Sequence, residues 1–397
     1  MRTGTDAMGT PRRKGGAGQG EPSRRSALRT LAGIGLAVPL SGAWSGAGAS
    51  GMPLRLAAAW QQGDGGYRIG LLEAQPGSGT ALRALHALEI PTRAHGLCPL
   101  PDGSIVAASR RPGDWLLRWW PGTAREPVWQ WSDGQRSFNG HVIASPDARL
   151  LLSTETEAET GRSLVVLRDA ASLEMRAEWS TQGIDAHELI WDRRAPVDGT
   201  PTLIVANGGV PTAPETGRVK RALDTMDSSI VRLHGGTGET LGQWRLQDRR
   251  LSLRHLAWNP AVDVLGIALQ AEHDGMDARA AAPVLALFDG KVLRTADPAP
   301  QVLPGGLRGY GGSIAGLAEG WTVSCPRAQG IAAFDARGGW QRLIALPEAC
   351  ALAVRDSGLW AAGVDHTLEN AQGTAPLRHP HGPSLTDARV DNHWYPA

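Results

Sequence analysis

Residues 183–209 read GIDAHELIWDRRAPVDGTPTLIVANGG. A histidine, His187, opens a short apolar run, and a second apolar run covers residues 203–206. Between the two runs lies a polar segment at 196–199 that contains proline, aspartate and glycine. Two β-rich runs separated by such a cluster predict a pair of antiparallel strands joined by a turn.

The same pattern recurs along the chain. It reads HGLCPLPDGSIVAA at 95–108, HVIASPDARLLLST at 141–154, HLAWNPAVDVLGIA at 255–268 and, without the histidine, SIAGLAEGWTVSC at 313–325. His95, His141 and His187 follow one another at intervals of 46 residues, and the interval of 68 residues from His187 to His255 leaves room for an insertion. A period in the forties with several short strands per unit is typical of a β-propeller. We therefore predict an all-β fold, a single propeller of seven four-stranded blades, with six or eight blades as alternatives.

The N-terminal segment 1–49 is predicted to be a signal peptide rather than part of the fold. Residues 23–29, SRRSALR, resemble the twin-arginine export motif, although alanine stands where an aromatic residue is usual. An apolar stretch and a small-residue cleavage site follow, and the apolar stretch is too short for a stable membrane anchor. The alternative is a disordered tail with a chance arginine pair. We expect a periplasmic protein whose propeller occupies residues 50–397, about 50 residues per blade.

The composition excludes some partner classes. Lys and Arg number 40 and Asp and Glu 39, so the net charge of +1 favours neither nucleic acid nor an anionic membrane as a partner. Fifteen tryptophans, against three tyrosines and three phenylalanines, predict that Trp is the main aromatic filler between blades. The three cysteines form no CxxC or haem-attachment motif. A Cys325–Cys350 disulfide is conceivable in an exported protein and would leave one thiol over.

Three further segments complete the predicted ring. An insertion at 210–227 is long enough to lie over one face of the propeller, where function usually resides. A second variable loop covers 273–282. The tail at 391–394 is expected to return and pair with the first blade, because an unpaired edge strand would promote aggregation.

Four histidines are candidate metal ligands: His95, His141, His187 and His255. Each is expected at the start of the innermost strand of its blade, so that their side chains converge on one mouth of the central channel. Imidazole suits iron, copper, zinc or nickel. The alternative is architectural, because some propeller repeats carry a Gly-His pair in every blade. Side chains expected near them, either to orient them or to bind an anion, are Arg136, Asp185, Glu188 and Arg254.

Two more ligand-binding candidates come from loops. Asn207, followed by two glycines, would permit close approach of the backbone to a ligand, although a plain strand-ending turn is an equal interpretation. Arg327, which follows Cys325 and Pro326, and the pair Arg110–Arg111 have guanidinium groups that bind carboxylate or phosphate, unless they are solvated or bridge blades. Cys325 has no motif that supports a nucleophilic role. No catalytic signature is found, so the sequence does not identify an enzyme.

Seven ordered motifs then resemble a known family: FNGH (138–141), GIDAHEL (183–189), VANGG (205–209), SLRH (252–255), YGGS (310–313), SCPR (324–327) and DNH (391–393). They resemble the "domain of unknown function 1513" family of exported bacterial proteins. The resemblance implies a seven-bladed propeller similar to the amine dehydrogenase heavy chain and other YVTN-type propellers. Members of the family are typically encoded beside imelysin-type iron-uptake proteins and a di-haem oxidoreductase, which implies a role in periplasmic iron acquisition. The resemblance implies no cofactor.

The sequence departs from the pattern of that family in two loops. Thr156 follows Glu155 where the family tends to have asparagine, and Ala328–Gln329 replaces Gly-Asn after SCPR.

Our first functional hypothesis is a periplasmic binding or scaffold protein of an iron or other metal acquisition system. It would hold iron, another transition metal or a partner at the histidine-bearing mouth, and imelysin-type or di-haem proteins are the expected partners. The rival is a metal-dependent hydrolase or oxidoreductase subunit that uses Glu188, Asp185 or His187 as acid or base. A purely structural partner of a di-haem protein is the third hypothesis.

Overall fold

The computed structural model describes residues 52–212, 219–220, 222–297, 305–370 and 375–397. The chain divides into two compact units, 1–46 and 47–397, and all of the described residues lie in the second. The predicted signal peptide, 1–49, lies outside the described residues. In the described part, strands dominate and helices are few and short, as the alternation of apolar runs and turns predicted.

Five separate four-stranded sheets follow one another along the chain, and within each the strands are neighbours in chain order. The first contains β4 (Ala94–Pro99), β5 (Ile105–Ser109), β6 (Trp115–Trp119) and β7 (Val128–Trp131). The second contains β8 (Arg136–Ala144), β9 (Leu150–Glu157), β10 (Ser163–Asp169) and β11 (Met175–Ser180). The third contains β12 (Ala186–Trp191), β13 (Thr202–Asn207), β14 (Ser229–His234) and β15 (Thr240–Trp244).

The fourth and fifth sheets continue the series. The fourth contains β16 (Leu251–Trp258), β17 (Leu265–Ala271), β18 (Leu285–Phe288) and β19 (Leu293–Thr295). The fifth contains β20 (Ser313–Leu317), β21 (Gly320–Cys325), β22 (Gly330–Asp335) and β23 (Trp340–Ala345). The described helices all lie in connections: η2 (Leu223–Thr225), α2 (Met276–Ala281), η3 (Pro326–Ala328) and η4 (Pro383–Leu385).

The remaining strands close the ring. They form an eight-stranded sheet in the order β27-β26-β25-β24-β28-β1-β2-β3. Only one parallel residue pair, Leu352 with His393, joins its two halves, so it consists of two four-stranded units. Its strands are β1 (Leu54–Gln61), β2 (Tyr67–Ala74), β3 (Arg83–Ile90), β24 (Leu352–Arg355), β25 (Gly358–Ala362), β26 (His366–Asn370), β27 (Leu377–Pro380) and β28 (Arg389–Pro396).

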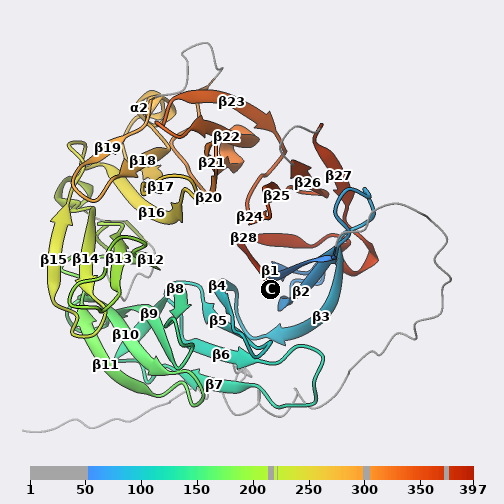
Figure 1. Ribbon diagram of the computed structural model, residues 1–397, viewed down its shortest axis with the longest axis horizontal. Coiled ribbons are helices and arrows are strands. Elements are labelled where there is room, and N and C mark those ends of the chain that lie inside the picture. The colour runs from blue at the N-terminus through green and yellow to red at the C-terminus, as the bar shows by residue number, and fades with distance from the viewer. Residues whose placement is uncertain (1–51, 213–218, 221, 298–304, 371–374) are drawn as a thin grey trace, which may run out of the picture. The chain divides into compact units, whose positions relative to one another are not determined.

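The C-terminal strand β28 pairs antiparallel with β1, so the tail supplies the innermost strand of the first blade as predicted. The described strands therefore group into seven four-stranded blades. Each innermost strand contacts the next around the ring, from β4 and β8 through β24 to β28, which returns to β4. Figure 1 shows the blades arranged in a ring. The predicted all-β propeller is confirmed.

Tryptophans join neighbouring blades. The indole N–H of Trp191 in β12 donates to the carbonyl of Ala144 in β8, at 2.7 Å. Trp258 in β16 donates in turn to the carbonyl of Trp191, at 2.9 Å. Buried apolar clusters fill the spaces between successive sheets, and Trp321 and Trp360 are among the largest fully buried side chains. This packing holds the inner strands at fixed positions around the channel.

Candidate metal centre

Five innermost strands share an irregularity at one position, and in each of them a histidine occupies it. The strand register shifts between Ala94 and Leu97 in β4, Phe138 and Val142 in β8, Ala186 and Leu189 in β12, Leu253 and Leu256 in β16, and Trp394 and Val390 in β28. The pairs β20–β21 and β24–β25, all of whose residues are described, keep an unbroken register, and β20 and β24 contain no histidine. A bulge re-aims a side chain, and here it is associated with the histidine-bearing strands.

The bulged histidines are His95, His141, His187, His255 and His393, and they gather in one cluster. Ring centroids of successive members lie 4.8 Å (His95–His141), 4.7 Å (His141–His187), 4.7 Å (His187–His255) and 4.4 Å (His255–His393) apart, and His393 is 4.7 Å from His95. One ligand nitrogen from each of His95, His141, His255 and His393 lies within 4.8 Å of the others. The structure thus brings together all four histidines that the sequence singled out.

His393 is the member that sequence reasoning missed. It lies on β28, and its signal in the sequence was the expectation that the tail closes the ring. A closing strand is an innermost strand, so a histidine on it should enter the same channel as the other four. The motif DNH at 391–393 carried this information, but it does not share the apolar pattern of the other repeats.

Close approach of two inner strands depends on glycine. A Cβ atom at Gly96 would lie 2.5 Å from the carbonyl oxygen of Gly140. Gly140 has a φ of +101° and itself packs against the ring of His95. Side chains at these two positions would separate β4 from β8, so the glycines allow His95 and His141 to meet.

The five imidazoles are neutral at physiological pH. Burial lowers the pKa of each, and in His141, His187, His255 and His393 to well below the usual value. Repulsion among the rings adds to this, and the charge of Arg254 lowers the pKa of His141, His187 and His255 further. A neutral imidazole has a free lone pair, which is the form that binds a metal.

Protein oxygens face the Nδ1 atoms of three of the rings. Asp391 Oδ1 lies 3.6 Å from Nδ1 of His95, and Glu188 Oε1 lies 3.8 Å from Nδ1 of His141. Ser313 Oγ lies 3.5 Å from Nδ1 of His393. The Nε2 atoms of His141 and His393 are buried and have no hydrogen-bond partner among the described residues. An oxygen near Nδ1 and a free Nε2 is the arrangement found around metal-bound histidine.

Glu188 was predicted beside the histidines, and the structure places it there. Its Oε2 accepts a hydrogen bond from the backbone N–H of Leu256, at 2.6 Å. Burial raises the pKa of its carboxyl to about 8. Glu188 therefore connects β12 to β16 and is able to exchange a proton near neutral pH.

Asp185 and Arg254, also predicted near the histidines, form an ion pair. Arg254 Nη1 lies 3.0 Å from Asp185 Oδ2, and Arg111 contacts the other carboxylate oxygen. Asp185 adopts a positive φ of 57°, a conformation that Asp tolerates better than most residues. Arg254 is 4% exposed, and its Nε has no hydrogen-bond partner among the described residues. This pair puts a buried cation next to the bulge of β16.

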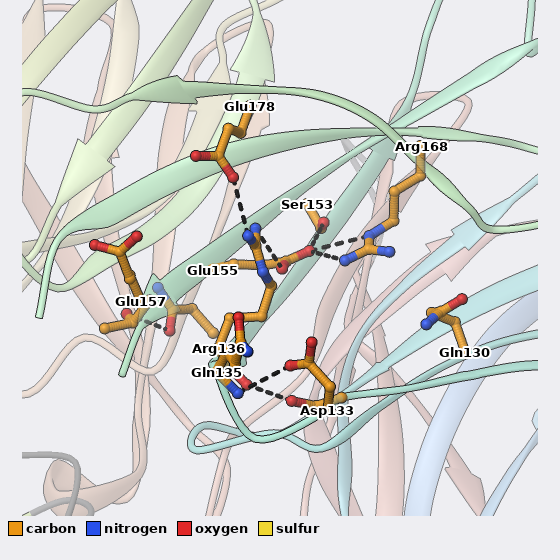
Figure 2. Close-up of polar contacts among 12 residues, drawn as sticks. Gln130, Asp133, Gln135, Arg136, Ser153, Glu155, Glu157, Arg168 and Glu178 are labelled. Carbon is orange, nitrogen blue, oxygen red and sulfur yellow. Dashed lines mark hydrogen bonds and ion pairs between the residues drawn. The ribbon is translucent and has the colours of Figure 1, made fainter. Parts of the chain in front are cut away.

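The side chain of Arg136 contacts residues of its own blade (Figure 2). Its guanidinium is 3.0 Å from Glu178 on β11 and 3.9 Å from the buried carboxylate of Glu155 on β9. Glu155 also pairs with Arg168 at 2.8 Å and accepts a hydrogen bond from Ser153 at 2.6 Å. These contacts join all four strands of one sheet, β8 to β11, and they give Arg136 and Glu155 a structural function.

The two loop candidates are placed differently from each other. The amide of Asn207 is buried and donates to the carbonyl of Thr181 at 2.9 Å and to Ser229 Oγ at 3.1 Å, so it ties strand ends together. Arg327 lies in η3, with its guanidinium 4.3 Å from the ring centroid of Tyr310. Their roles as ligands stay predictions.

The surroundings of the three thiols disfavour the thiolate form. All three cysteines are free, so the conceivable Cys325–Cys350 disulfide is not formed. Burial raises the pKa of Cys98 to about 11 and the pKa values of Cys325 and Cys350 to about 12. Each thiol is thus protonated at neutral pH and weakly reactive.

A sequence model of the family described as "Protein of unknown function (DUF1513)" matches residues 88–397, well over half of the chain. The chain belongs to this family. No curated protein matches this chain. The family assignment agrees with the resemblance of the seven motifs, and the description of the family names no activity.

Solved structures similar to this DUF1513 protein share its fold. Kuenenia stuttgartiensis hydrazine synthase gives a TM-score of 0.51 at 10% identity, covering 81% of this chain and 96% of that one. A functionally unknown protein from Desulfotomaculum acetoxidans DSM 771 gives 0.50 at 9% identity, covering 86% and 100%. The Dos1 propeller gives 0.50 at 10% identity, covering 84% and 87%. At such low identity these likenesses show the propeller fold alone.

Among the residues that the structure describes, no helix is both long and apolar enough to cross a membrane.

Proposed function

We propose that this protein binds a transition-metal ion through the imidazoles of its central channel. One observation carries the proposal: His95, His141, His255 and His393 are buried, and their ligand nitrogens lie within 4.8 Å of one another. A buried nitrogen without a hydrogen bond costs about 1–3 kcal/mol, and the cluster contains several. A bound ion would give the buried Nε2 atoms of His141 and His393 a partner.

The cluster is nearly the right size for one ion. Nitrogens bound at about 2.1 Å from a metal are at most about 4.2 Å apart. The largest separation in the set of four is 4.8 Å, so the cluster needs to contract by only about half an ångström. His187 lies beside the set, and its Nε2 is in hydrogen-bond contact with His255 Nε2 at 2.9 Å. Imidazole ligands suit iron, copper, zinc or nickel and not the oxygen-preferring magnesium or calcium.

We further propose that the metal is iron and that the protein serves as a periplasmic binding or scaffold component of metal acquisition. The twin-arginine-like segment at 23–29 supports export in a folded state, with metal already bound. The resemblance of the seven motifs supports imelysin-type or di-haem proteins as partners. Neutral buried imidazoles support tight retention of the ion, because protons do not compete for them.

One observation favours a second candidate, a metal-dependent hydrolase or oxidoreductase subunit. Glu188 lies 3.8 Å from His141 Nδ1, and its raised pKa of about 8 suits a proton acceptor or donor beside a metal. In that case Glu188→Gln would abolish turnover but leave the metal bound. In a binding protein the same variant changes affinity alone.

Elemental analysis of untagged protein, purified without chelator, tests the proposal. We expect near-stoichiometric metal in the wild type and in His86→Ala, a control that removes an exposed histidine of β3. We expect loss of metal in His141→Ala/His393→Ala. His393→Gln, which keeps a polar side chain of similar size, serves if the double variant does not fold. Metal-free wild-type protein that takes up no iron, copper, zinc or nickel would overturn the proposal.

A further inference from the structure

A cavity of about 320 Å³ lies at the seam where the ring closes. Tyr310 and Arg327 line it from the segments that flank β20 and β21, and Val364 lines it from the turn after β25. Arg389, Val390 and Asn392 line it from the closing strand β28. The volume is at the lower end of the range of about 300–1,000 Å³ for ligand pockets. Three successive parts of the chain thus meet around a space large enough for a small molecule.

The charge of the cavity wall is positive. Arg327 and Arg389 line it, and neither forms an ion pair with a carboxylate of the described residues. Glu348 is the one carboxylate among the described lining residues. The nearby carboxylate of Asp391 is already held by Arg93, whose Nη2 donates to it at 2.9 Å. An anion entering the cavity would therefore meet two arginines that form no ion pair with a described carboxylate.

The rest of the wall is apolar and partly pre-organised. Pro326, Val364, Ala388 and Val390 contribute hydrocarbon surface. The guanidinium of Arg327 lies over the ring of Tyr310, at 4.3 Å from its centroid, which restricts its orientation. A guanidinium held in this way binds a carboxylate with two parallel hydrogen bonds.

We propose that this cavity binds a small carboxylate with an apolar body, the carboxylate on Arg327 and Arg389 and the body against Val364 and Val390. This site is separate from the proposed metal ligands and does not rest on the presence of a metal. It does adjoin them through β28: Asn392 lines the cavity, its amide donates to the carbonyl of Gly312 at 3.4 Å, and His393 is the next residue. A ligand in the cavity would therefore contact β28, the strand that carries His393.

Titration calorimetry on metal-free protein tests the site. The probes are monocarboxylates of six to ten carbons, such as benzoate and octanoate, and the matched uncharged amides. We expect saturable binding of at least one carboxylate, with its amide about tenfold weaker or more, since a hydrogen bond to a charged group is worth that much. Failure of every carboxylate to bind would overturn the proposal, whatever the metal content of the protein.

Variants locate the binding. Arg327→Gln is expected to weaken binding about tenfold or more. Arg342→Gln, which removes an exposed arginine of β23 in the same blade, should leave it unchanged. Val364→Trp fills the cavity from a position that is 47% exposed, so it should fold normally and abolish binding. Equal affinities in Arg327→Gln and Arg342→Gln, or full binding in Val364→Trp, would place the carboxylate elsewhere and refute the site.

Discussion

His187 and His255 face each other through Nε2 atoms that lie 2.9 Å apart, although 68 residues separate them in the chain. Two lone pairs at this distance repel, so one ring must carry its proton on Nε2 and donate it to the other. The pair comes from adjacent blades, β12 and β16, and it links the fifth histidine to the set of four. The two members are therefore expected to differ in their effect on metal binding.

His255→Gln is expected to weaken metal binding more than His187→Gln. His187 supports His255 through the shared proton, and loss of such a supporting residue lowers metal affinity by about 10–100-fold. His255 belongs to the set of four, so His255→Gln should lower the metal affinity by more than that range. Competition with a chromogenic chelator measures both affinities, with His86→Gln as the control. Equal losses in the two variants would contradict the assignment of His255 to the inner set.

Arg93→Ala is expected to destabilise the closed ring. Arg93 precedes β4 and pairs with Asp391 of β28, which is 3% exposed. Burial by itself raises the pKa of Asp391, but the nearby His95 and the hydrogen bonds and charge of Arg93 outweigh it and hold the pKa far below its usual value. Removal of Arg93 leaves a buried carboxylate, at a cost of about 3 kcal/mol, the lower end of the usual range because Arg93 is partly exposed.

Urea denaturation measures that loss, and Arg93→Ala/Asp391→Asn serves as its control. The double variant removes the uncompensated charge, so it should be more stable than Arg93→Ala alone. A double variant that is the less stable of the two would show that Asp391 stabilises the ring without Arg93.

Glu155→Gln is expected to cost more stability than Glu178→Gln, although both carboxylates contact Arg136 (Figure 2). Glu155 is fully buried and pairs with Arg168, whose side chain is 5% exposed. Loss of its charge leaves a buried guanidinium, at a cost of about 3–5 kcal/mol. The side chain of Glu178 is 35% exposed, and its loss should cost less than about 1 kcal/mol. Urea denaturation measures the free energy of unfolding of both variants. Similar losses of stability in Glu155→Gln and Glu178→Gln would contradict the prediction.

Asp102→Asn is expected to lower stability at neutral pH but not in acid. Burial raises the pKa of Asp102, but hydrogen bonds from Ser104 and Trp120 and the charge of Arg118 outweigh it and lower the pKa to about 2. A carboxyl with a lowered pKa contributes stability above its unfolded value of 3.8, and this contribution is lost as the pH falls toward 2. The difference between wild type and variant should therefore be largest at pH 5–7.

Thermal unfolding at several pH values gives this difference for Asp102. Glu174→Gln, which removes an exposed carboxylate between β10 and β11, is the control for a general effect of removing a negative charge. A stability difference that stays constant down to pH 2 would show that the ionised form of Asp102 contributes nothing.

The propeller itself could be predicted from the sequence, because blade architecture is a local and repeated property. Equal intervals between His95, His141 and His187, with a turn in each repeat, set the strand pairs before any contact between blades is known. The four histidines were found for the same reason: each has the same place in its own repeat. Glu188 and Arg254 followed as their direct neighbours in the chain.

Tertiary structure alone decided how these groups meet. His393 enters the cluster because β28 closes the ring against β1, a pairing between the two ends of the propeller. The bulges that accompany all five histidines are breaks in the pairing of one strand with the next, and periodicity does not encode where a ladder breaks. Likewise, Arg327 and Arg389 meet only at the seam between the last blades and the first. The sequence determines which side chains each blade carries, but closure of the ring determines which of them share a site.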